Sequence, residues 1–234
     1  MSPVTLDGPS LQVTVNPQAG GTITHVLHKS TGLSVLGTVP WGTVDFPLAH
    51  PAARGEPEWL TRYTGGWPLL FPNAGDACFV EGTFHGFHGE ASIAAWNAEE
   101  HDGALVLART FTTLPAIMRR RITVEGEVLR VCEELTAIGS RPVDVMWGHH
   151  PTFGSDLLAA PFEVTCGAHH CEAEVTYDPP SNPIVPGASG TWPLLGAKTG
   201  GSVDLAHPRD SWASVAYLKN FGAPWAAIRR MDDA

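Results

Sequence analysis

Short segments of alternating apolar and polar residues, separated by glycine and proline, constrain the fold of this chain most. The 234 residues include 25 glycines and 20 prolines spread along the sequence. This composition favours many turns and short strands over long helices. No stretch of a dozen residues has the 3.6-residue periodicity of an amphipathic helix. We therefore predict an all-β fold, a large antiparallel β-sandwich with little helix, in one domain.

The predicted strands follow the alternating segments. They span residues 11–15, 22–27, 105–114, 118–124, 128–135, 143–147, 162–166, 172–177, 202–205, 213–218 and 225–229. Gly126 separates two of these strands and predicts a hairpin. The segment 41–66 is rich in proline and glycine and is predicted to be a long loop.

Charge and hydropathy exclude several classes of partner. The formal net charge is −10 and the longest basic run is the three arginines at 119–121, so nucleic acid is not an expected partner. No segment reaches the ~20 apolar residues that span a bilayer, and residues 1–14 lack the features of a secretory leader. We expect a cytoplasmic protein without a membrane partner, whose four cysteines are reduced.

Two histidine-containing clusters point to a sugar site. The first lies within residues 65–96 and gathers five polar side chains among glycines and tryptophans: Asn73, Asp76, His85, His88 and Glu90. The second spans residues 147–153 and includes Trp147 and the pair His149-His150. Imidazoles move protons near neutral pH, because free imidazole titrates near pH ~6.5, and aromatic rings stack on the apolar faces of pyranoses. Neighbouring residues of a strand face opposite ways, so only one histidine of the pair can face a cleft.

Four motifs carry a resemblance to a known family. They are FPNAGD, HGEASIAAW, WGHHPTFG and the late segment WASVAYLKNFGAPWAAIRR. Through them most of the chain resembles the aldose 1-epimerase (galactose mutarotase-like) family, especially its divergent bacterial branch. The resemblance implies one galactose mutarotase-like β-supersandwich domain over residues 1–234, shortened at the C-terminus, that binds a hexose.

The resemblance also implies a mechanism and a set of residues. A base removes the proton of the C1 hydroxyl while an acid protonates the ring oxygen; the ring opens, rotates and closes as the other anomer. His150 matches the family's acid and His88 its sugar-binding histidine, with His85 as the neighbour that substitutes if the alignment shifts. The further substrate-binding candidates are Asn73, Glu90, Trp147 and Asp204. No cofactor is implied, because neither proton transfer needs a metal or a nucleotide.

One departure from the family concerns the general base. The family's catalytic glutamate follows the residues that match WAAIRR, and this chain stops before it. Either another carboxylate serves, or turnover is impaired, since losing a general base commonly costs ~10²–10⁴ in rate. The strand at 225–229 would also lie at a sheet edge, where it could pair with a second copy of the chain.

Two other functions stay open. One is a non-catalytic sugar-binding or sensing protein on the same scaffold. The other is a metal-dependent sugar isomerase that uses His85, His88, Glu90 and His150, although the chain lacks an HxH ligand pair. The segment 166–171 holds two cysteines and two histidines, but no second pair of matching spacing completes the four ligands of a structural zinc. We expect no metal.

Overall fold

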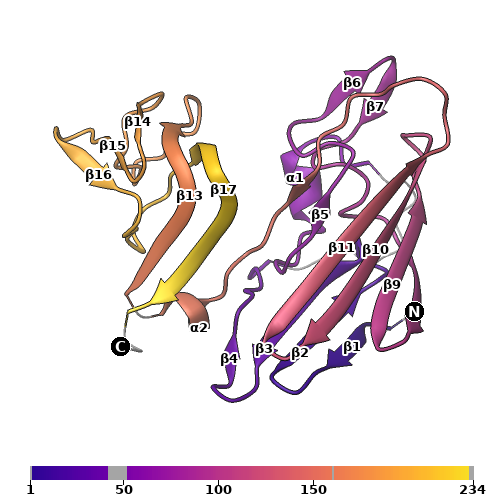
Figure 1. The fold of residues 1–234 in the computed structure, drawn as a ribbon. Coiled ribbons are helices and arrows are strands. Elements are labelled where there is room, and N and C mark those ends of the chain that lie inside the picture. The colour runs from indigo at the N-terminus through magenta and orange to yellow at the C-terminus, as the bar shows by residue number, and fades with distance from the viewer. Residues whose placement is uncertain (1, 42–51, 160, 232–234) are drawn as a thin grey trace. The chain divides into compact units, whose positions relative to one another are not determined.

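A computed structural model describes residues 2–41, 52–159 and 161–231 (Figure 1). Regular structure is almost entirely β, in antiparallel sheets, which confirms the predicted fold class. The chain divides into two compact units, Met1–Leu157 and Leu158–Ala234. The expectation of a single domain stays a prediction. None of the described helices is long and apolar enough to cross a membrane.

The first unit is built on two four-stranded sheets. The strand order of one is β1-β2-β3-β4, and that of the other is β11-β10-β9-β8. Their bounds are β1 (Val4–Asp7), β2 (Leu11–Asn16), β3 (Thr22–His28), β4 (Leu33–Ser34), β8 (Asn97–His101), β9 (Ala104–Thr110), β10 (Ala116–Glu125) and β11 (Val128–Ala137).

The core of the first unit lies between these sheets. Alternate residues of β2 (Leu11, Val13 and Val15) are buried with Leu105 of β9 and Met118 of β10. This is the inward face expected of an antiparallel strand with one side in a core. The predicted hairpin at Gly126 is confirmed, since β10 and β11 pair along their whole length.

Short elements connect the sheets of the first unit and carry the polar clusters. They are α1 (Glu56–Leu60), β5 (Leu69–Leu70), β6 (Cys78–Val80), β7 (Thr83–His85), β12 (Gly148–His149) and α2 (Ser155–Leu158). Strands β6 and β7 form a hairpin, and β5 pairs with β12. The second pairing brings the two predicted clusters side by side.

The second unit has its own sheets and core. Strand β13 (Phe162–Ala173) lies between β14 (Ser189–Thr191) and β17 (Ala216–Arg230), and β15 (Leu194–Gly196) pairs with β16 (Ser202–Asp204). Its core includes Cys171, Ile184 and Leu195.

Several predicted boundaries were wrong. No strand covers 143–147, where Trp147 and its neighbours are exposed and β12 begins only at Gly148. The strands predicted at 162–166 and 172–177 merge into β13, which ends at Ala173, so residues 174–177 are not in a strand. Those predicted at 213–218 and 225–229 merge into β17, which begins only at Ala216. The two strands pair over most of their length, and a bulge between Cys166 and Ala168 absorbs the irregularity. The predicted loop 41–66 contains α1, and its residues 42–51 lie outside the described residues.

Candidate functional site

A tight turn carries His88 and Glu90 of the first cluster. His88 and Gly89 both have left-handed backbone conformations, with φ of +57° and +70°. A Cβ at Gly89 would lie 2.3 Å from the carbonyl oxygen of Phe71, so only glycine fits this close approach. The amide of Ala91 donates to that same oxygen at 2.9 Å. The turn therefore packs closely against the backbone of the segment that begins at Phe71.

Asn73 holds this turn from the other side. Its amide nitrogen donates to the carbonyl oxygens of Gly75 (3.2 Å), Asp76 (2.7 Å) and Gly86 (3.0 Å), and its side-chain oxygen accepts from the amide of Gly75 at 3.1 Å. The residue is buried. Asn73 was predicted to bind substrate, but its hydrogen bonds are made inside the protein, and this placement favours a positioning role.

Glu90 is also occupied by internal partners. Its carboxylate accepts hydrogen bonds from Arg109 and from the amides and hydroxyls of Thr112 and Thr113. Burial alone would raise the pKa of this carboxyl, but Arg109 and the threonine donors outweigh it and hold the pKa below its usual value. Glu90 is 1% exposed, which favours an anchoring role over contact with a substrate.

The structure brings His88 and His150 together. We call these two side chains the imidazole pair; their ring centroids lie 5.6 Å apart. Trp59 contacts both rings edge-on, at 4.7 Å from His88 and 5.7 Å from His150. Tyr63 stacks on Trp59 at 4.5 Å, and its hydroxyl lies 3.4 Å from Nδ1 of His150. The same hydroxyl is hydrogen-bonded to Thr152.

Trp59 and Tyr63 were missed by the sequence analysis, because they lie in the segment predicted to be a loop. The signal was their spacing, because residues four apart share one face of a helix. Trp59 is in α1, and Tyr63 lies three residues after its last residue, Leu60. Both side chains are buried.

His88 is held in its neutral form. Burial lowers the pKa of His88 to about 4, and the neighbouring His150 adds to the effect. The backbone of Ala74 and Gly75 and the carboxylate of Asp76 act in the opposite direction. At neutral pH this ring therefore has one nitrogen that donates and one that accepts. Its Nδ1 is buried without a hydrogen-bond partner among the described residues.

His149, the last residue of β12, belongs to a different cluster from His150, which follows the strand. Its Nε2 lies 3.5 Å from a carboxylate oxygen of Glu133, which also accepts from the indole of Trp147 at 2.8 Å. The other oxygen of Glu133 lies 2.7 Å from Nε of the fully buried Arg120. Burial opposes ionisation of Glu133, but His149 and Arg120 outweigh it and lower its pKa.

The other predicted residues lie elsewhere. Trp147 is 44% exposed. His85 is buried and lines a separate cavity of the first unit. Asp204 belongs to the second unit, where it accepts from the amide of Ala206 and pairs with His207 at 2.9 Å. Across residues 2–41, 52–159 and 161–231, no three His, Cys, Asp or Glu side chains are grouped to hold a metal ion.

Two comparisons with known proteins identify no relative of this chain. A scan against protein-family models finds no match, and a search of curated proteins finds none either. The resemblance to aldose 1-epimerases therefore rests on the motifs, and the function has to be argued from the geometry of the site.

Proposed function

We propose that the first unit binds a hexose at the imidazole pair and interconverts its α and β anomers. One observation carries the proposal: three segments far apart in the sequence place His88 and His150 in contact with each other and against Trp59 and Tyr63. Two imidazoles held against buried aromatic rings supply the proton chemistry that the interconversion of anomers needs.

In this proposal the two histidines have different tasks. His88, with its lowered pKa, stays neutral and binds a sugar hydroxyl as donor or acceptor. His150 gives a proton to the ring oxygen as the C1 hydroxyl loses one, and both protons return when the ring closes on the other face. The hydroxyl of Tyr63, 3.4 Å from Nδ1 of His150, orients that ring.

We propose Asp76 as the base that accepts the C1 proton. It is exposed, and its charge acts on His88. Its backbone oxygen accepts from Asn73 at 2.7 Å, which fixes the loop that carries it. The buried carboxylates of Glu90 and Glu133 have internal partners and are less suited to the task.

Polarimetric mutarotation of α-glucose and α-galactose tests the proposal. The protein should accelerate the reaction over buffer, and His150→Ala should abolish the acceleration. Asp76→Asn should lower the rate by about 10²–10⁴, the usual effect of losing a general base. His101→Ala, an exposed histidine of β8, is the matched control and should behave as wild type. Full activity in the His150 variant would refute the assignment.

A second candidate function is sugar binding without turnover. The internal partners of Glu90 and Glu133 favour it, since neither of these carboxylates is available to take the C1 proton. Its signature would be a hexose that perturbs the indole NMR signal of Trp59 while the rate of mutarotation stays at that of buffer.

A further inference from the structure

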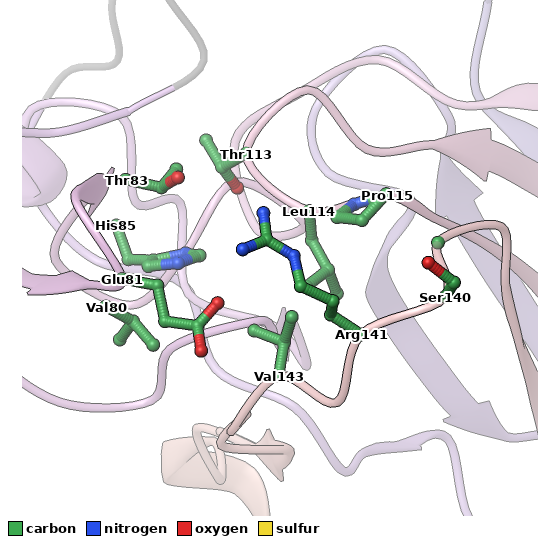
Figure 2. A pocket seen from close by; sticks show the side chains of 11 residues that line it. Val80, Glu81, Thr83, His85, Thr113, Leu114, Pro115, Ser140, Arg141 and Val143 are labelled. Atoms are coloured by element: carbon green, nitrogen blue, oxygen red, sulfur yellow. The ribbon is translucent and has the colours of Figure 1, made fainter.

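The first unit has a cavity separate from the imidazole pair. Its volume is about 290 Å³, in the range of small-ligand sites. It lies between the β6–β7 hairpin, the segment 113–115 and the segment 139–143 (Figure 2). None of the side chains of the imidazole pair, Trp59 or Tyr63 lines it.

Two nitrogen-bearing side chains meet in this cavity. Figure 2 shows the guanidinium of Arg141 and the imidazole of His85 directed into the same space. His85 is only 3% exposed, and its Nδ1 is buried with no hydrogen-bond partner among the described residues. A buried polar atom without a partner is unfavourable unless something else supplies the bond. Arg141 is exposed and forms no ion pair with the carboxylates of the described residues at 4.0 Å or less.

The remaining lining is mixed. The carboxylate of Glu81 lies on the hairpin side of the cavity, and Ser140 lies on the side away from His85 (Figure 2). Apolar side chains, including Leu114, Pro115 and Val143, form other parts of the wall. The cavity therefore offers donors for an oxyanion, an acceptor for a hydroxyl and surface for a short carbon skeleton.

We propose that this cavity binds a small hydroxylated organic anion, a carboxylate or a phosphate ester. The oxyanion accepts hydrogen bonds from the guanidinium of Arg141 and from the imidazole of His85, and a hydroxyl of the same molecule donates to Glu81. The carboxylate of Glu81 repels a bare anion, so a ligand that also brings a hydroxyl donor is favoured. The proposal does not depend on the mutarotase assignment, because the two sites use different side chains.

NMR titration of the isotope-labelled full chain tests this. The probes are gluconate for the carboxylate class and glycerol phosphate for the phosphate class, with glucose and glycerol as uncharged controls. We expect one or both anions at millimolar concentrations to shift the ring signals of His85 and the Nε–H signal of Arg141. The uncharged controls should leave both signals in place. The anion that binds more tightly identifies the class.

Variants decide whether the named groups hold the anion. Arg141→Gln should weaken binding at least about tenfold, because charge-assisted hydrogen bonds are the strong ones. Arg119→Gln removes the same charge from an exposed position on β10 and should leave the affinity unchanged. Glu81→Gln should weaken gluconate while strengthening inorganic phosphate.

Three results would overturn the proposal: equal affinity in Arg141→Gln and wild type, equal shifts of His85 with glucose, or no shift with either anion. His150→Ala separates the two sites, since it should abolish mutarotation without changing anion binding. A chain inactive on sugars that still binds gluconate through Arg141 would refute the proposed function and leave this inference standing.

Discussion

Replacing Glu90 by glutamine should destabilise the first unit strongly, because the carboxylate is used as a multiple acceptor. One oxygen accepts from Nε of Arg109 at 3.1 Å and from its Nη2, and the other accepts from the amide of Thr113 and from the hydroxyls of Thr112 and Thr113, all at 2.9 Å. An amide nitrogen cannot accept a hydrogen bond. Whichever way the glutamine lies, at least two donors lose their acceptor.

The magnitude follows from the environment of those donors. A buried donor left without an acceptor costs about 1–3 kcal/mol, and breaking a buried charge pair costs about 3–5 kcal/mol. The side chain of Glu90 is fully buried and that of Arg109 is 14% exposed. We therefore expect Glu90→Gln to lower the free energy of unfolding by about 3–5 kcal/mol, a large part of the 5–15 kcal/mol typical of a domain.

Urea unfolding followed through the indole NMR signal of Trp96 measures this effect in the first unit, because Trp96 is buried in its core. Glu100→Gln is the matched control; it makes the same charge change at an exposed position of β8 and should stay within about 0.5 kcal/mol of wild type. A loss below about 1 kcal/mol in Glu90→Gln, together with weaker sugar binding, would refute the anchoring role and restore Glu90 as a substrate contact.

Two further predictions concern the turn that carries the first cluster. The ring of His88 should titrate near pH 4 in an NMR titration. The unfolded chain binds this proton up to about pH 6.5, so the free energy of unfolding should rise as the pH increases from about 4 to 6.5. This rise should be smaller in His88→Gln. A wild-type slope in that variant would contradict the assignment. Gly89→Ala should lower the thermal midpoint and disturb the imidazole pair, because its Cβ meets a backbone carbonyl oxygen at 2.3 Å. Gly103→Ala is the control, at φ +71° with nothing within 4 Å of the added Cβ, and should show only the backbone strain of about 1–2 kcal/mol. An equal loss of stability in the two variants would argue against the close approach at Gly89.

The sequence predicted the strands whose side chains alternate between core and solvent. Strands β2, β3, β10 and β11 lie where alternation placed them, and Gly126 marked their clearest hairpin. The two-residue strands β5 and β12 were not predicted, because long-range pairing defines them rather than local pattern. The same reason explains why continuous β13 and β17 were predicted as separate pieces.

The candidate site was predicted only in part. Glycine and aromatic context singled out His88 and His150, which the fold brings into contact. Their aromatic neighbours Trp59 and Tyr63 were not predicted, because the helix in that segment has only five residues, too few for a clear helical pattern. The internal role of Glu90 depends on donors 19 to 23 positions away, and no local signal marks such a pairing.

The turn from His85 to Glu90 joins three environments through one short stretch of backbone. His85 lines the cavity that also includes Arg141, His88 contacts His150 in the imidazole pair, and Glu90 is hydrogen-bonded to Arg109. The effects of substitutions within the turn should therefore be non-additive, since each substitution shifts the backbone that positions the other side chains. Ligand preference at either site would therefore be easier to change at lining residues outside the turn than within it. For the cavity at His85, such residues lie in the segment 139–143.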